Sequence, residues 1–319
     1  MKDPKNILQN DFINSKTPVE EIRDPLIKNT GIRLLVKRED LNHPFVSGNK
    51  WHKLKYNLVA ACEDGFDTIL TFGGAYSNHI YALAAAGKLF GLNTIGVIRG
   101  HEHLPLNPTL SFAVKSGMKI YYIDKDSYRK RNSISFINSL KDRYGKIYII
   151  PEGGTNSLGV KGASEILLNV TENYDYVCCA CGTGGTLAGI ITKLAGKAQA
   201  LGFSVLKDGK FLVDDVEKMV FQSSSCEYDN WEINLDYHLG GYAKINSELI
   251  NFINRFEKIN RITIEPIYTG KLFYGIYELI RIGYFNRGIT ILAIHTGGLQ
   301  GIAGMEPKIK KPLYSEDDK

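Results

Sequence analysis

The sequence predicts an α/β protein built around parallel β-sheets. Short apolar runs rich in β-branched residues alternate with amphipathic, helix-like segments along most of the 319 residues. Many of the 32 glycines stand where such a run gives way to a helix. This alternation is typical of βαβ units, in which helices cover a parallel sheet. At roughly 150 residues per domain, the length favours two domains.

The expected elements follow one another from the first third of the chain to its end. The strand-like runs are 67–72, 94–98, 119–123, 147–150, 176–180, 262–264 and 290–294. Helix-like stretches run from Lys50 to Cys62 and over 78–91 and 187–194, and others begin near Pro108 and after Tyr268. The last of these has a broad apolar face that includes Leu272, Ile276 and Leu279, which predicts a helix packed on a sheet.

Composition and charge exclude several classes of protein. The chain is 44% hydrophobic and 23% charged, which is typical of globular proteins and not of disordered, collagen-like or coiled-coil chains. Lysine and arginine exceed the acidic residues by only five, and they are scattered apart from a short stretch at 308–311. No apolar run approaches the length of a membrane helix, and the N-terminus lacks a signal-like apolar stretch. We therefore expect neither nucleic acid nor a membrane as a partner.

Five cysteines are an odd number, and three of them lie together at Cys178, Cys179 and Cys181. This pattern favours a reducing, cytoplasmic setting over a disulfide framework. The three stand in an apolar run that reads as a buried strand, where cysteine behaves as a small apolar residue. No histidine or second cysteine pair has zinc-finger spacing, so no metal site is expected.

The loop Cys181-Gly-Thr-Gly-Gly-Thr186 follows one strand and opens a helix. Its glycines allow several N–H groups to converge on an anion at the helix N-terminus. The loop lacks the Gly-Lys-Ser/Thr of a P-loop and the Gly-x-Gly-x-x-Gly of a dinucleotide site, and no acidic ribose-binding residue follows in 202–207. Phosphate binding and tight strand-to-helix packing both remain open from this loop alone.

Lys50 follows Ser47-Gly-Asn at the start of a helix. There it faces the positive end of the helix dipole, and with partial burial its pKa should fall. A lowered pKa is what a nucleophilic lysine needs. A solvated surface lysine is the alternative that this segment leaves open.

Three further turns place polar side chains at strand ends. Ser77 and Asn78 begin a helix, where they either cap it or donate hydrogen bonds to a ligand. Tyr268, Thr269 and Thr296 stand just before or beside glycines after later strands. Because ligands bind at the carboxyl ends of parallel strands, these turns predict one composite site.

Six motifs together resemble the D-cysteine desulfhydrase and 1-aminocyclopropane-1-carboxylate (ACC) deaminase family of pyridoxal-phosphate (PLP) enzymes. In order they are Ser-Gly-Asn-Lys50, Gly-Gly-Ala-Tyr-Ser-Asn78, Pro-Glu-Gly-Gly-Thr-Asn156, Gly-Thr-Gly-Gly-Thr186, Tyr-Thr-Gly-Lys271 and His-Thr-Gly-Gly298. The resemblance spans about residues 34–304. It implies a fold of the tryptophan synthase β type (fold type II), with PLP in the cleft between two open, twisted parallel-sheet domains. The smaller domain is expected at about 47–160, and the larger at 1–46 plus 161–319.

The resemblance also implies roles in holding the cofactor. Lys50 matches the lysine that attaches PLP covalently, and Asn78 matches the residue that binds the ring's phenolic oxygen. The phosphate cup is expected at Gly182, Thr183, Gly184, Gly185 and Thr186.

On the substrate side, Ser77 matches the residue that faces the substrate carboxylate, and Tyr242 and Tyr268 match two active-site tyrosines. ACC deaminases carry Glu and Leu where this chain has Thr269 and Thr296, which is the desulfhydrase pattern. A carboxylate near the pyridine nitrogen would make the ring a stronger electron sink, and a neutral hydroxyl does not. Thr at both positions therefore favours β-elimination over opening of a cyclopropane.

The expected function is conversion of D-cysteine to pyruvate, ammonia and hydrogen sulfide by a cytoplasmic homodimer, the dimer being implied by the resemblance. ACC deaminase, which would yield 2-oxobutanoate, and a non-catalytic PLP-binding protein remain alternatives. Glu152 and Tyr76 depart from the family pattern, and Tyr76 is expected to narrow the substrate pocket. A nicotinamide-dependent oxidoreductase would leave Lys50 unexplained.

Overall fold

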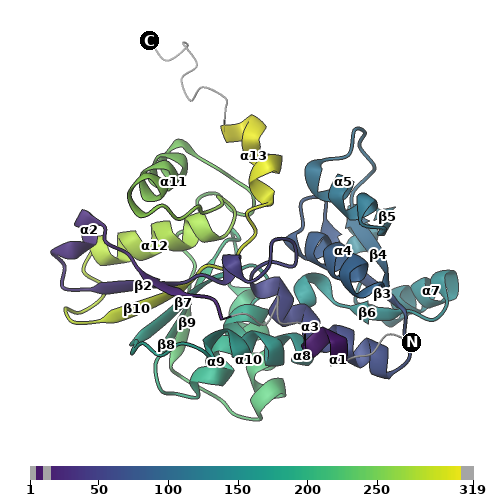
Figure 1. Cartoon of the computed structure of the whole chain (residues 1–319), viewed down its shortest axis with the longest axis horizontal. Helices are drawn as coiled ribbons and strands as arrows, with labels where there is room; N and C mark the ends of the chain where they lie inside the picture. Colours follow the sequence, from purple (N-terminus) through teal and green to yellow (C-terminus); the bar gives the residue numbers. More distant parts are fainter. Residues whose placement is uncertain (1–4, 10–15, 310–319) are drawn as a thin grey trace.

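The computed structural model describes residues 5–9 and 16–309, and within them two β-sheets lie side by side with helices on their faces (Figure 1). The predicted fold class is thereby confirmed. Loops at the carboxyl ends of strands from both sheets meet between them, as described for the site below.

The larger sheet has six strands in the order β1-β2-β10-β7-β8-β9. All neighbours are parallel except β1 and β2. The strands are β1 Val19–Glu21, β2 Arg33–Lys37, β7 Tyr176–Cys181, β8 Gln199–Ser204, β9 Trp231–Asn234 and β10 Thr290–Ile294.

The smaller sheet has four parallel strands in the order β5-β4-β3-β6. They are β3 Thr68–Gly74, β4 Asn93–Arg99, β5 Lys119–Ile123 and β6 Tyr148–Ile150.

Helices cover both faces of the larger sheet (Figure 1). In β7, Cys178 packs on the side of α11 and α12, whereas Val177 and Cys179 pack on the side of α8, α9 and α10. This alternation follows from the two-residue period of a strand, and it makes β7 apolar on both faces. The α-helices are α1 Lys5–Leu8, α2 Pro25–Lys28, α3 Asn49–Glu63, α4 Asn78–Phe90, α5 Pro108–Lys115, α6 Lys125–Arg129, α7 Ile134–Tyr144, α8 Ser157–Ser164, α9 Gly185–Leu194, α10 Phe211–Ser224, α11 Ser247–Asn260, α12 Thr269–Arg281 and α13 Gly301–Ile309, and the 3₁₀ helices are η1 Glu39–Leu41, η2 Glu152–Gly154 and η3 Glu165–Leu167.

The prediction of a strand at 262–264 is wrong. These residues form neither helix nor strand and pair with no strand of the described chain. Ile262 and Ile264 are buried in the core beneath α11 and α12, and the carbonyl of Thr263 bonds the His295 ring instead of a neighbouring strand. The apolar alternation there reflects burial of the segment and not a place in a sheet.

Within the described ranges, no helix combines the length and apolarity that crossing a bilayer requires.

Candidate active site

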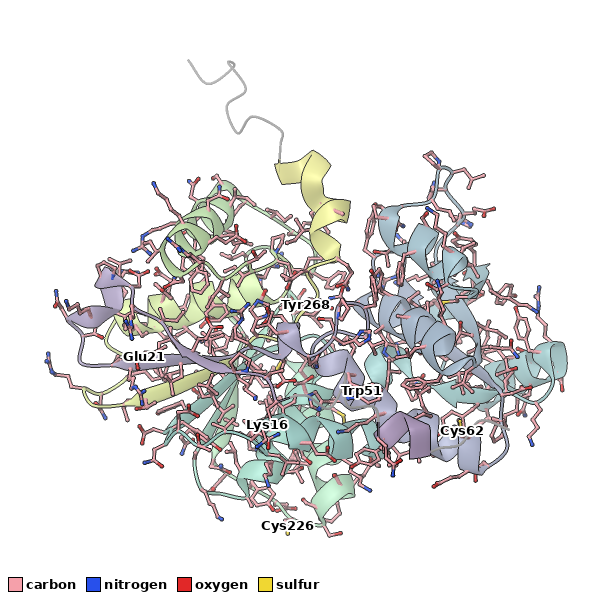
Figure 2. The ribbon with its side chains drawn as sticks, viewed as in Figure 1. Lys16, Glu21, Trp51, Cys62, Cys226 and Tyr268 are labelled. Carbon is pink, nitrogen blue, oxygen red and sulfur yellow. The ribbon has the colours of Figure 1, made fainter. Side chains whose placement is uncertain are left out.

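A cavity of about 520 Å³ opens where strand ends from both sheets meet. Figure 2 shows Tyr268, one of its lining residues, near the middle of the molecule. The sequence-predicted residues that line the cavity are Lys50, Ser77, Asn78, Gly182, Thr183, Gly184, Gly185, Thr186, Tyr242, Tyr268 and Thr296. The structure thus brings together turns that are up to 246 positions apart in the chain, from 50 to 296.

Lys50 lies in the first turn of α3 and lines the cavity. Desolvation by the surrounding protein lowers the pKa of its ammonium group to about 8. This is the direction expected from the sequence, and it leaves a fraction of the amine neutral and nucleophilic near pH 7.

The start of α3 is fixed to two other loops. Gly48 has φ +67°, and a Cβ there would lie 1.8 Å from the carbonyl oxygen of Thr296, so only glycine fits this contact. The N–H of Asn49 donates to that same carbonyl (3.3 Å), and its side-chain amide donates to the Thr186 hydroxyl (2.8 Å). Lys50 is therefore held against both the β7–α9 loop and the loop after β10.

The β7–α9 loop has the features of an anion site. Gly184 has φ +76°, and α9 begins at Gly185, so unpaired N–H groups of the helix N-terminus point into the cavity region. The Lys53 ammonium lies 2.9 Å from the position that a Cβ on Gly185 would take. Burial, followed by repulsion from Lys50, holds the pKa of Lys53 well below its usual range. A dianionic phosphate placed here would meet both the helix dipole and this buried cation, so these residues fit the PLP phosphate.

Sequence reasoning missed Lys53. The sequence does indicate it, because residues three apart in a helix share a face and Lys53 is three residues after Lys50 in the same predicted helix. Thr155 was missed as well: its hydroxyl accepts a hydrogen bond from Lys53 (3.2 Å) and shares one with Thr183 (2.7 Å). This chain of contacts connects α3 to the β7–α9 loop through the turn after η2.

Ser77 and Asn78 begin α4 and line the cavity. The Ser77 hydroxyl oxygen accepts from the N–H groups of His79 (3.2 Å) and Ile80 (3.3 Å), so it caps the helix and keeps its own proton to donate. The Asn78 side-chain oxygen accepts from Gln300 (2.6 Å), which leaves its NH₂ as the donor for a ligand oxygen.

Two tyrosines form one wall of the cavity. The rings of Tyr242 and Tyr268 meet edge to face with centroids 6.0 Å apart, and the Tyr268 ring lies over Gly182. Burial raises the pKa of both phenols, and for Tyr268 the neighbouring Tyr242 adds to the shift. Both hydroxyls therefore stay protonated near neutral pH. The Lys271 ammonium donates to the carbonyls of His238 (2.7 Å) and Gly241 (2.5 Å), and so fixes the loop that carries Tyr242.

Thr269 is not among the residues that line the cavity. It is fully buried, and its hydroxyl accepts from the N–H of Glu265 (2.9 Å) and lies 3.2 Å from the Glu265 carboxylate. That carboxylate also accepts from the backbone N–H groups of Ile267, Tyr268 and Thr269. Thr269 thus takes part in the cap of α12, whereas Thr296 remains the threonine whose side chain borders the cavity.

Tyr76 and His52 lie outside the lining. Tyr76 packs against Gly304 of α13, where a Cβ would meet its ring at 2.5 Å, so the expected narrowing of the pocket is wrong. His52 faces the buried Glu39 carboxylate (2.7 Å).

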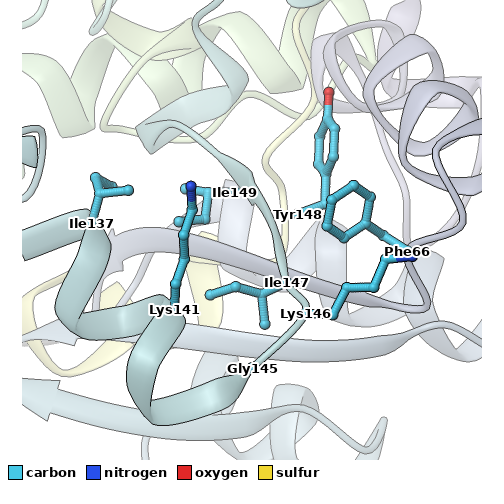
Figure 3. Close-up of a pocket in the computed structure, with 8 residues that line it drawn as sticks. All are labelled: Phe66, Ile137, Lys141, Gly145, Lys146, Ile147, Tyr148 and Ile149. Atoms are coloured by element: carbon cyan, nitrogen blue, oxygen red, sulfur yellow. The ribbon is translucent and has the colours of Figure 1, made fainter.

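A second pocket, of about 380 Å³, lies at the β6 edge of the smaller sheet (Figure 3). Ile137 and Lys141 of α7 and Phe66 face strand β6 across it. None of the predicted site residues lines it.

Comparisons with known proteins point to one family. Residues 12–297 match the family model described as "Pyridoxal-phosphate dependent enzyme". A Thermotoga maritima protein that bears the provisional name of ACC deaminase is 33% identical over 303 residues, which cover 90% of this chain and 95% of the relative. The Arabidopsis thaliana mitochondrial protein named "Bifunctional D-cysteine desulfhydrase/1-aminocyclopropane-1-carboxylate deaminase" is 32% identical, covering 90% of this chain and 77% of that protein.

A crystal structure described as an ACC deaminase homologue superposes with a TM-score of 0.84 at 30% identity, over 93% of this chain and 94% of that one. The chain therefore belongs to the pyridoxal-phosphate dependent enzymes of fold type II, in the family of ACC deaminase and D-cysteine desulfhydrase, and pyridoxal phosphate is its cofactor.

Proposed function

We propose that this PLP-dependent lyase acts on D-cysteine, releasing pyruvate, ammonia and hydrogen sulfide by β-elimination. The observation that carries the proposal is the setting of Lys50, an amine with a pKa of about 8 that faces a cavity opposite a phosphate-type loop. The choice of D-cysteine is supported by Thr296, a neutral hydroxyl bordering the cavity where ACC deaminases carry leucine in the corresponding motif.

When bound, PLP supplies the electron sink for negative charge at the substrate α-carbon. Lys50 is the amine that holds the cofactor and, once free, the base that takes the α-proton. Lys53 and the N-terminus of α9 would hold the phosphate, and the Asn78 NH₂ would donate to the ring oxygen.

The Ser77 hydroxyl donates a hydrogen bond to the substrate carboxylate, which fixes the Cα–H bond relative to Lys50. As the α-proton moves to Lys50, the Cβ–S electron pair leaves with sulfur as hydrosulfide. Tyr242 or Tyr268, each kept protonated by burial, stands ready to protonate the departing sulfur. The released enamine hydrolyses in water to pyruvate and ammonia.

The test is the visible absorption of the PLP-loaded protein before and after addition of D-cysteine, with sulfide measured in parallel. Lys50→Ala should lower sulfide release on the order of 10³-fold or more, because both attachment and proton transfer are lost. Lys88→Ala, an exposed lysine on α4, serves as the control and should leave release unchanged. Normal sulfide release by Lys50→Ala would reject the assignment.

ACC deaminase activity is the second candidate, since relatives carry that name. It predicts release of 2-oxobutanoate from ACC. A yellow protein that responds to neither compound would instead be a PLP-binding protein without this chemistry.

The proposal includes a homodimer in a reducing, cytoplasmic setting, in keeping with the odd number of five cysteines in the chain. Light scattering of the PLP-loaded protein would give twice the chain mass of 35.6 kDa for the dimer.

A further inference from the structure

Two arginines of the smaller-sheet region line the active-site cavity, and neither has a role in the chemistry above. Arg99 is the last residue of β4 and pairs in register with Gly74 at the end of β3. Arg131 follows α6. The other lysine and arginine side chains of the lining are Lys50 and Lys53, which the proposed function assigns to the cofactor's carbonyl and phosphate. Arg99 and Arg131 are therefore the two cations of the lining to which the cofactor assigns no role.

A single buried ring supports both guanidinium groups. Tyr128 of α6 is 2% exposed, and its ring centroid lies 5.6 Å from Arg99 and 4.8 Å from Arg131. Cation–π contacts of this kind favour a guanidinium near the ring face. Because Tyr128 is fixed in the core of the smaller sheet, packed edge to face with Phe72, it holds the two arginines close to one another at the cavity.

The carboxylates at the cavity neutralise this pair only in part. Arg131 bonds Glu152 (2.9 Å), but the buried Nε–H of Arg131 has no acceptor within the described part of the chain. Over the same residues, Arg99 forms no ion pair. Asp215, the other acidic lining residue, belongs to α10, which packs against the Gly184 loop of the larger sheet. One positive charge and one buried N–H donor are therefore left for a ligand.

We propose that Arg99 and Arg131 bind a negatively charged group on the substrate's side chain. The substrate class is then an amino acid whose β-substituent is anionic, such as a carboxylate, sulfonate or phosphate, or becomes anionic as it leaves, as a thiol does. Guanidinium groups match such oxyanions with paired hydrogen bonds. The inference rests on the proposed function and deepens it, since D-cysteine enters the class through the hydrosulfide that leaves its β-carbon. In β-elimination the Cβ–S electron pair leaves with sulfur, so the same cations also face the charge that develops on the leaving group.

The experiment compares two ligands of equal size that differ in charge. The PLP-loaded protein is titrated with aspartate and with asparagine, each in both enantiomers, and the change in visible absorption is followed. We expect aspartate to half-saturate the change at a concentration at least about tenfold lower than asparagine, as for a charge-assisted hydrogen bond made in a partly desolvated site. In Arg99→Gln and Arg131→Gln this preference should fall to about twofold or less.

Arg129→Gln is the matched control, because Arg129 is two residues from Arg131 but lies on the surface beside Asp126 with 80% of its side chain exposed. It should keep the wild-type preference. Retention of the bound-cofactor absorption band shows that each variant is folded. If a variant fails to fold, the wild-type comparison of aspartate with asparagine still decides.

Equal binding of aspartate and asparagine by a protein that releases sulfide from D-cysteine would overturn the inference and leave the proposed function standing. A preference for aspartate in a PLP-loaded protein that releases no sulfide would support the arginine site and reject D-cysteine as substrate. A protein that takes up no PLP would overturn both.

Discussion

Glu39 is a buried carboxylate that contacts the first turns of α3, the helix that carries Lys50. The residue is 3% exposed, and its carboxylate accepts a hydrogen bond from the Thr17 hydroxyl (2.5 Å). The carboxylate also lies 2.7 Å from the ring nitrogen of His52, which is two residues after Lys50. The Lys37 ammonium of β2 stands 3.6 Å away. Glu39 thus connects the larger sheet to the first turns of α3.

The pH dependence of stability should reveal this carboxylate. Desolvation raises the pKa of Glu39, but His52, Thr17 and Lys37 outweigh it and bring the value down to about 2, against 4.5 for an ordinary glutamate. The stabilisation is fully present above pH 4.5. It is lost as the pH falls towards 2, because the unfolded chain takes up the proton first. The shift of 4.5 − 2 = 2.5 units corresponds to about 3 kcal/mol.

We therefore expect the difference in unfolding free energy between wild type and Glu39→Gln to shrink as the pH is lowered from 4.5 to 2. Urea denaturation across this range provides the measurement. Glu21→Gln, which alters a 44% exposed carboxylate beside Arg33, should give a small difference throughout. A Glu39→Gln difference that does not change with pH would contradict the prediction.

At the residue scale, motifs located most of the lining but not its electrostatic partners. Lys50, Ser77 and Thr296 were named from strand-end turns, because glycines and hydroxyls mark such turns in the sequence. Glu39 and Glu265 were not, because each is a carboxylate whose burial depends on distant residues or on how a helix begins. A lone glutamate gives no sign in the sequence of being buried.

Among the elements, α3 and α8 approach each other unusually closely. A Cβ on Gly162 of α8 would lie 1.7 Å from the carbonyl oxygen of His52 on α3. A Cβ on Gly189 of α9 would likewise lie 2.5 Å from the Cβ of Ala163 on α8. The three helices α3, α8 and α9 therefore pack in a row, with a glycine at each contact. The backbone of the helix that carries Lys50 and Lys53 is positioned by this stack.

Gly162→Ala tests the stack. In an isolated helix this change would stabilise by about 1 kcal/mol. Here we expect destabilisation of about 1–3 kcal/mol, because α3 and α8 must move apart. Denaturant unfolding gives the sign directly, and PLP affinity should weaken with it since Lys50 moves. A variant as stable as wild type or more so would show that the contact yields without strain.

The whole molecule divides into two sheets, and the cavity that we propose holds the cofactor takes residues from both. Asn78 follows a strand of the smaller sheet, whereas Thr186 and Thr296 follow strands of the larger one. We propose the domain boundaries given by the sequence resemblance, 47–160 against 1–46 with 161–319. The strand-like runs predicted the smaller sheet and the two central strands β7 and β10 of the larger one, but not β1, β2, β8 and β9. Of these, β1 and β9 are short and β8 contains glycine, so they carry little periodicity. The strand β2 is five residues long with an apolar centre, Leu34 to Val36, so the sequence does indicate it.

Removal of PLP should therefore lower the melting temperature of the entire molecule. A ligand that contacts both sheets binds only the state in which they are correctly placed, and so it stabilises the folded chain by mass action. Thermal unfolding of PLP-loaded and PLP-free protein, followed by circular dichroism, provides the comparison. We expect one transition in the loaded protein and a midpoint several degrees lower without PLP. Identical midpoints would contradict a cofactor that joins the sheets.

The order of strands in the larger sheet has a consequence for synthesis of the chain on the ribosome. β2 lies between β1 and β10, so its only parallel neighbour is a strand made some 250 residues later, from 37 to 290. Until that strand leaves the exit tunnel, one side of β2 has no hydrogen-bonding partner and Gly48 has no Thr296 carbonyl to pack against. A nascent chain thus exposes Lys50 long before it can form the cavity, and PLP can be captured only after translation is nearly complete.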